Sequence, residues 1–186
     1  MNLTTILGLV VLGVLAYGVS IYNFFVQAKV QIQASIQEIG NQLKRQAELI
    51  PNLETSAKAY LTHEKDILKL LADARKLSDQ GKDASSKLSE LLPKLQIVVE
   101  SNPQLKGADV IQNLMSELRD TSDKVMYSRR SLIDLTADYN AKLAVFPANL
   151  VAQAFGFKPE AGLKTPTQGA HLEVSTSDII TPKVKL

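Results

Sequence analysis

The chain has 186 residues, which is room for one soluble domain beside a membrane anchor. It contains no cysteine, which excludes a disulfide framework, a cysteine zinc site and a thiol nucleophile. Its two histidines, His63 and His171, are too far apart in the sequence to indicate a histidine-rich metal site. The 21 basic and 19 acidic residues are well mixed and leave a net charge of +2, so the chain lacks the basic stripe that neutralises nucleic-acid phosphates. We therefore expect neither a nucleic-acid partner nor a cofactor.

The first 28 residues carry no charged side chain, and residues 6–26 are almost wholly apolar. A helix rises about 1.5 Å per residue, so about 20 apolar residues cross a hydrocarbon layer of about 30 Å. We therefore predict a transmembrane anchor over residues 1–28. The alternatives are a cleaved signal peptide, with a cleavage site near Ala16, and a helix buried in a protein core. The lack of a basic segment before the apolar run disfavours the first, and hydrophobicity on every face disfavours the second.

Aromatic side chains gather at the C-terminal end of the predicted span, where a membrane-interface belt is expected. They are Tyr22, Phe24 and Phe25. No Lys or Arg precedes the span, whereas Lys29, Lys44 and Arg45 follow it. By the positive-inside rule, the domain after the span is expected in the cytoplasm.

Helical periodicity continues without a break beyond the predicted span. Apolar residues recur every three or four positions and form one seam, made of Ile32, Ile36, Ile39, Leu43 and Ala47. Proline lacks a backbone N–H and clashes with the preceding turn, and asparagine is a good cap for a new helix. We therefore predict one helix from Leu3 to Leu49 that ends at Ile50-Pro51-Asn52.

Three further amphipathic segments follow. The first has a seam made of Leu53, Ala57, Tyr60, Glu64, Ile67, Leu71 and Ala74. A shorter helix is predicted over Ala84–Val99, with Pro93 causing a kink or a later start, and a long one over Ala108–Val145. Short turns favour antiparallel neighbours, so we predict an all-α fold. In it, the transmembrane helix continues into an antiparallel up-down four-helix bundle over residues 29–145.

The up-down topology returns residues 146–157 to the membrane. This segment is uncharged between Lys142 and Lys158. We expect its large apolar side chains at the headgroup boundary or against the anchor helix, and the alternative is that they cap the open end of the bundle core. These side chains are Phe146, Leu150, Phe155 and Phe157. Residues 158–186 are rich in Pro, Gly, Thr and Ser, which predicts a flexible tail.

Several short motifs stand out along the chain. They are Gln42–Arg45, Leu49–Leu53, Tyr60, His63–Glu64, Ala74–Arg75, Asn102–Lys106, Tyr127–Arg129, Asp138–Asn140, Phe146–Leu150 and Phe155–Phe157. In this order and spacing they resemble the LemA family, from about Tyr22 to Phe157. The resemblance implies a bacterial protein of the inner membrane with a single span and an antiparallel helical bundle. It implies no established activity.

Eight polar residues are expected to have structural rather than catalytic roles. They are Lys44, Arg45, His63, Glu64, Arg75, Arg129, Tyr139 and Asn140. Adjacent His63 and Glu64 point about 100° apart on a helix, and no second His follows at the spacing of a zinc-protease pair. Glu64 falls on the predicted buried seam, where a carboxylate needs a partner. We expect Arg75, Lys44 or Arg129 to provide one.

Nothing in the sequence indicates catalysis, and we expect no catalytic or metal site. The favoured function is a non-enzymatic, membrane-anchored scaffold that contacts membrane lipid and self-associates through laterally packed bundles. The alternative is a regulatory adaptor that recruits a membrane protease or a signalling partner, through either the bundle or the tail. A hydrolase ranks well below both.

Overall fold

A computed structural model describes residues 2–58, 60–61, 64–102 and 109–163. In these ranges the chain forms five helices and no strand. They are α1 (Leu3–Lys58), α2 (Lys65–Asp79), α3 (Ser85–Ser101), α5 (Asp109–Ala144) and α6 (Ala148–Phe155). The predicted all-α fold, with a long apolar N-terminal helix that continues into a helical bundle, is confirmed.

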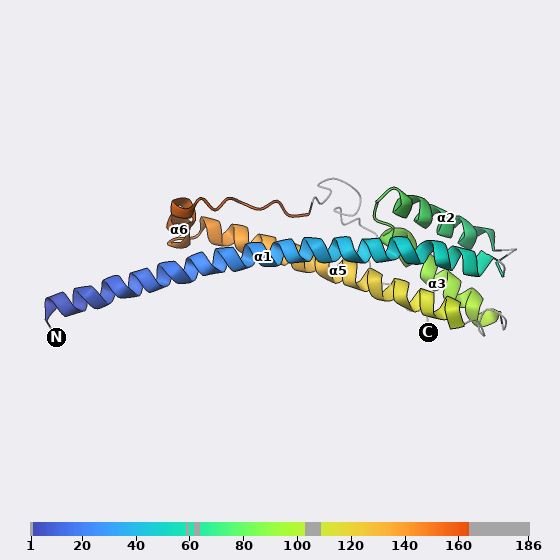
Figure 1. The fold of residues 1–186 in the computed structure, drawn as a ribbon, viewed down its shortest axis with the longest axis horizontal. Helices are drawn as coiled ribbons and strands as arrows, with labels where there is room; N and C mark the ends of the chain where they lie inside the picture. Colours follow the sequence, from blue (N-terminus) through green and yellow to red (C-terminus); the bar gives the residue numbers. More distant parts are fainter. Residues whose placement is uncertain (1, 59, 62–63, 103–108, 164–186) are drawn as a thin grey trace, which may run out of the picture.

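The molecule is a long rod built on α1 and α5 (Figure 1). Helix α1 runs along its whole length, and α5 packs antiparallel against the half of α1 that lies away from the N-terminus. The shorter helices α2 and α3 lie at the end far from the N-terminus, and α6 lies at the near end of α5. Four helices therefore pack together only in the distal part of the rod.

Helix α1 does not end at Pro51, so the predicted break at Ile50-Pro51-Asn52 was wrong. Proline inside a helix costs about 3 kcal/mol. Here Ile50, Leu53 and Ala57, on either side of it, are all fully buried, and this packing outweighs the local cost. The hydroxyl of Thr55 also donates to the carbonyl of Pro51 at 2.9 Å. The first helix thus extends to Lys58, and the second begins at Lys65 rather than at Leu53.

The buried face of α1 also differs from the predicted seam. Ile36 is 45% exposed, whereas Gln46, absent from the prediction, is buried. On the second predicted seam, Tyr60 and Glu64 are exposed. The later boundaries agree closely: α3 includes Pro93 and starts at Ser85, and α5 ends one residue before Val145.

Two separate apolar cores hold the rod together. The distal core joins α1, α2, α3 and α5, with Leu61, Leu71, Leu88 and Leu118 among its fully buried members. The proximal core joins α1, α5 and α6. It consists of Ile21, Phe25, Ala28, Ile32, Leu132, Tyr139, Ala148 and Ala152.

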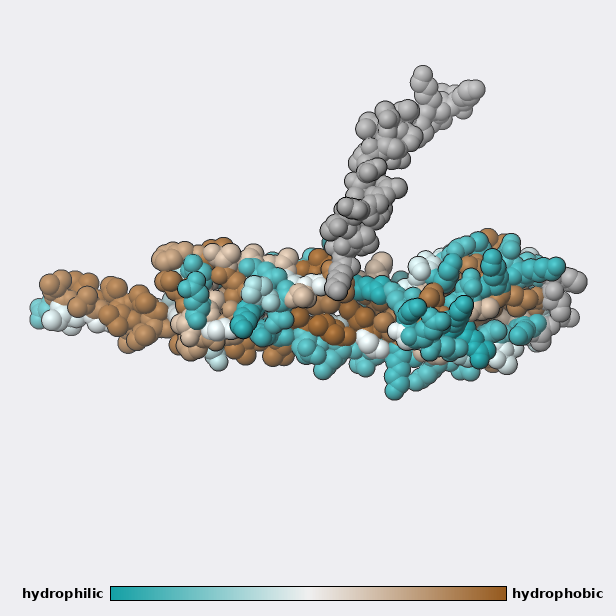
Figure 2. Space-filling view, turned by 90° about the horizontal axis from the view of Figure 1, so that it is seen from above, coloured by the Kyte–Doolittle hydropathy of each residue, from teal (hydrophilic) through white to brown (hydrophobic). Residues whose placement is uncertain are grey.

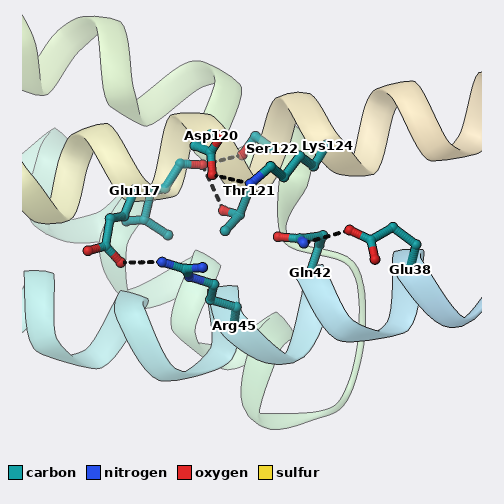
Figure 3. Close-up of polar contacts among 9 residues, drawn as sticks. Glu38, Gln42, Arg45, Glu117, Asp120, Thr121, Ser122 and Lys124 are labelled. Carbon is teal, nitrogen blue, oxygen red and sulfur yellow. Dashed lines mark hydrogen bonds and ion pairs between the residues drawn. The ribbon is translucent and has the colours of Figure 1, made fainter.

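Between the two cores, α1 and α5 meet through polar side chains (Figure 3). Arg45 pairs with Glu117 at 3.1 Å across the two helices. The amide of buried Gln46 donates to the hydroxyl of Ser122 at 3.2 Å, and that hydroxyl donates to the carbonyl of Leu118 at 2.8 Å. The stretch between the two cores therefore combines these polar contacts with the buried side chain of Val125.

The N-terminal part of α1 extends beyond its helical neighbours. On the face seen in Figure 2 it is apolar except at its N-terminal tip, and almost none of its most apolar stretch is buried. Among the described residues, α1 is the one helix long and apolar enough to cross a membrane. Uniform exposure of apolar side chains is typical of a lipid-facing helix and disfavours the alternative of a core helix.

Candidate membrane-proximal site

Helix α6 forms a short collar beside α1, at the level where α1 leaves the bundle. It ends because Gly156 adopts φ 71°, a left-handed conformation that glycine reaches without strain. This cap directs the N–H of Gly156 to the carbonyl of Gln153, and the N–H of Phe157 to that of Ala152. The chain thereby reverses direction, which brings Phe157 back onto the proximal core.

The inner face of α6 is made of small residues. Ala148 and Ala152, four positions apart, are both buried, and a methyl side chain lets the helix backbone approach its neighbours closely. Figure 1 views α6 nearly end-on, so its axis lies across that of α1. The collar therefore lies across the long axis of the rod.

Aromatic rings fill the space between α6, α1 and α5. The ring of Phe25 lies 5.6 Å from that of Tyr139 and 4.9 Å from that of Phe157, between centroids. Tyr22 contacts Phe155 at 4.8 Å and Phe157 at 5.7 Å. Such pairs stabilise by about 0.5–1.5 kcal/mol each beyond their burial. The cluster therefore ties the collar firmly to the anchor.

Phe25 was expected at the membrane interface, and that prediction was wrong because this side chain is fully buried in the proximal core. The sequence did contain a signal for this position. Ile21, Phe25, Ala28 and Ile32 are spaced by four, three and four residues, which continues the apolar seam of α1 toward the N-terminus. Phe157, also expected there, is half-buried against the same core.

The other expected interface residues do lie on the surface. Tyr22 and Phe24 are each 38% exposed, and Lys142 Nζ lies 5.6 Å from the centroid of the Phe24 ring, on its face. Phe146, just before the collar, and Leu150 and Phe155 within it have 75%, 55% and 64% of their surface exposed. The sequence proposed headgroup contact or capping of the core as alternatives. In the structure the inner face of α6 caps the core, and Phe155 also packs on Tyr22, whereas Phe146 and Leu150 stay largely exposed.

Residues 158–163 run back from the collar along the rod in an extended conformation (Figure 1). Asn140 holds this strap with both ends of its amide: Nδ2 donates to the carbonyl of Glu160 at 2.9 Å, and Oδ1 accepts from the N–H of Glu160 at 3.0 Å. The hydroxyl of Tyr139 donates to the carbonyl of Lys158 at 3.1 Å. A flexible tail beginning at Lys158 is therefore wrong for these six residues, and the rest of that prediction lies outside the described residues.

An ion pair reinforces the strap. Lys29 Nζ lies 3.0 Å from a carboxylate oxygen of Glu160, at the point where α1 leaves its uncharged stretch. Hydrogen bonding to Glu160, together with its negative charge, raises the pKa of Lys29 above its ordinary value. Burial raises the pKa of the Tyr139 hydroxyl. Tyr139 and Asn140, expected to have structural roles, thus position the strap.

The other polar residues singled out in the sequence do not gather at one site. Glu64 is exposed at the start of α2, so the buried carboxylate expected there is absent and none of the proposed partners contacts it. His63 lies outside the described residues, and Lys44 is exposed. Arg45 pairs with Glu117 between α1 and α5, as described above.

The two other arginines bind carboxylates that the sequence did not single out. Arg75 contacts the largely buried Glu54 at 3.0 Å and Asp79 at 3.6 Å. Arg129 forms an ion pair with Asp83 in the turn before α3. Burial alone would raise the pKa of Asp83, but hydrogen bonds from Ser85 and the pairing with Arg129 outweigh it and lower that pKa. Arg75 thus joins α2 to α1, and Arg129 joins α5 to the turn before α3.

Within the described ranges, no group of three or more His, Asp or Glu side chains could hold a metal ion. The model of the LemA family matches residues 35–176. The chain belongs to the LemA family. The match covers most of the chain from just after the uncharged stretch, and it confirms the resemblance carried by the motifs from Gln42–Arg45 onward. No curated protein matches this LemA family chain in sequence.

Proposed function

We propose that this LemA family protein is a non-enzymatic scaffold, anchored by residues 1–28 in the inner membrane of a bacterium with its bundle in the cytoplasm. The observation that carries the proposal is the continuity of α1 from Leu3 to Lys58. A helix without a break transmits the tilt of its anchor directly to the bundle. Packing of α5, α6 and the strap against α1 around Lys29 stiffens the point where a hinge would otherwise act.

An upright rod favours assembly with copies of itself. Anchors in one bilayer confine the rods to two dimensions and to similar orientations, which lowers the entropy lost when they meet. Helix α5 offers a contact for this purpose: Met126 and Ile133, seven residues apart, share one face and are 67% and 45% exposed. Both line a groove of about 580 Å³ between α5 and the start of α3.

Mass photometry of the full-length protein in a native-like detergent or nanodisc tests self-association. We expect a discrete species of several copies. The double variant Met126→Glu with Ile133→Glu should shift it to the monomer, because two carboxylates would be buried at the contact. Tyr127→Glu is the matched control, since Tyr127 is adjacent and 74% exposed but points about 100° away on the helix.

A species that stays monomeric at every protein concentration would contradict the scaffold. The regulatory adaptor would then be the better proposal, since it needs only a partner protein and not a second copy. A turnover of substrate that persists through purification would contradict the non-enzymatic assignment.

A further inference from the structure

The collar keeps a large apolar surface exposed, although one of its side chains, Phe155, packs partly on Tyr22. Phe146, just before α6, and Leu150 and Phe155 within it are all largely exposed. No charged residue occurs between Lys142 and Lys158, which enclose the segment in the sequence. On the face seen in Figure 2, the brown surface of the anchor is followed at this end of the bundle by further brown and tan patches, with teal side chains among them.

The collar lies on the membrane side of the first charged residue of α1. Phe155 packs on Tyr22, which precedes Lys29 by seven residues, or about 10 Å along the helix. Phe146 and Leu150 line a groove that reaches down α1 as far as Val10. If the span is centred midway along the uncharged stretch, near Val14, the collar sits in the outer part of one acyl layer.

Charged side chains define the other limit of this surface. Lys29 is held at Glu160 of the strap, Lys142 lies beside the ring of Phe24, and Lys158 follows the collar directly. Lysines at this depth place their ammonium groups among lipid phosphates while their stems cover apolar surface. The change from apolar to charged side chains over a few residues on α1, α5 and the strap matches the boundary between acyl chains and headgroups.

Two apolar grooves flank the crossing of α6 over α1. One, of about 670 Å³, is lined by residues from Val10 to Ile21 together with Phe146, Pro147, Leu150 and Val151. The other, of about 390 Å³, is lined by residues from Val14 to Tyr22 together with Phe155. Gly18 lines both, and a Cβ built there would meet nothing within 4 Å, so no part of the described chain fills the space above it.

We propose that α6 is immersed as a bar in the bundle-side leaflet, with acyl chains of that leaflet lying in the two grooves. This inference rests on the membrane span of the proposed function. The occupant is lipid because the grooves are continuous with the exposed surface of the anchor and open sideways at the same depth, and the surrounding lysines complement lipid phosphates. The protein then occupies more area in one leaflet than in the other.

Tryptophan fluorescence tests the immersion directly, because the chain has no tryptophan of its own. Four single variants are reconstituted at full length into phosphatidylcholine vesicles whose acyl chains carry bromine, a contact quencher, either near the headgroup or near the methyl end. Phe155→Trp and Leu150→Trp report on the collar. Leu12→Trp reports on the middle of the span, and Tyr127→Trp, on the exposed surface of α5, is the control in water.

We expect shallow bromines to quench Phe155→Trp and Leu150→Trp at least twofold, and deep bromines to quench Leu12→Trp most strongly. Tyr127→Trp should be unaffected by either. Quenching of Leu12→Trp without quenching of the collar variants would overturn the collar inference and leave the span intact. Absence of quenching at Leu12→Trp would overturn the span itself.

A second copy of the chain in the grooves would give a different pattern. Its anchor would shield the collar tryptophans from brominated lipid at high protein density, and quenching would rise as the protein is diluted with lipid. We expect no such dependence, and finding it would overturn the assignment of lipid as the occupant. Circular dichroism of each variant checks that the helices remain, which is expected since every replaced side chain is exposed.

Discussion

Replacing Asn140 by alanine should release the strap from the rod. The amide of Asn140 makes two hydrogen bonds to the backbone of Glu160, one as donor and one as acceptor. A neutral hydrogen bond contributes about 0.5–1.5 kcal/mol net, so the two contribute about 1–3 kcal/mol to holding residues 158–163. A change of 1.4 kcal/mol is a factor of ten in an equilibrium, so the population of the open strap should rise about 5- to 150-fold in Asn140→Ala.

Hydrogen–deuterium exchange measures that population, because the N–H of Glu160 exchanges only when it leaves the Oδ1 of Asn140. We expect a peptide covering 158–163 to exchange at least fivefold faster in Asn140→Ala, while peptides within α5 stay unchanged. The control is Asn113→Ala, which removes the same side chain from an exposed position of the same helix. If exchange of the peptide changes less than twofold, the contacts of Tyr139 and Lys29 alone hold the strap, and the role assigned to Asn140 is wrong.

Three further substitutions test the packing and electrostatics of the rod by urea titration of the detergent-solubilised chain, followed by circular dichroism. Leu71→Ala opens a cavity in the distal core and should lower the free energy of unfolding by about 2–5 kcal/mol, whereas exposed Ile97→Ala should change it by less than about 0.5 kcal/mol. Gln46→Leu replaces a buried amide whose Oε1 has no partner among the described residues, so it should raise the free energy of unfolding by about 1 kcal/mol. A decrease would show that the amide stabilises the middle of the rod. Arg129→Gln should lower the free energy of unfolding by no more than about 1 kcal/mol at neutral pH, because the ion pair of Arg129 with Asp83 is partly exposed. The pKa of Asp83 is lowered in the folded state. The difference in unfolding free energy between the original chain and Arg129→Gln should therefore be present above the ordinary carboxyl pKa of about 3.9, and vanish as the pH falls through the lowered value. A difference that persists in acid would contradict the role of this carboxylate.

Features that depend on neighbours along one helix could be predicted from the sequence. The long uncharged run starts a helix at Leu3, as predicted, and the three-four spacing of α5 and the apolar residues of α6 set elements whose ends fall within a few residues of the expected ones. The first helix was predicted to end early because proline has a strong local effect. Its actual extent depends on Leu53 and Ala57 packing against the other helices, which no local pattern specifies.

Features that depend on how helices meet were harder to predict. Glu64 occupied a position on an apparent seam, but that seam assumed one helix across residues 59–64, and the structure has two helices with Glu64 at the start of the second. The contact between Asn140 and Glu160 has no sequence signal at all, since an Asn on a helix and a Glu after a Pro are both common on surfaces. Its cause is the reversal at Gly156, which directs the following residues back along α5.

Under the proposed immersion of α6, the position of the collar gives the rod's orientation a physical basis beyond the stiffness of α1. A single helix in a bilayer can tilt and rotate at little cost, because its apolar surface is similar on every side. Buried Ala148 and Ala152 and the ring of Phe25 hold the collar across α1, so that it lies at one depth. A tilt of the rod moves one end of the collar toward the headgroups and the other end toward the bilayer centre. The exposed apolar side chains of Phe146, Leu150 and Phe155 resist movement toward the headgroups. Nearby Lys142 and Lys158 resist movement toward the bilayer centre. The collar therefore links the proposed immersion to the proposed self-association, because a rod kept upright in this way presents one fixed face of α5 to its neighbours in the membrane.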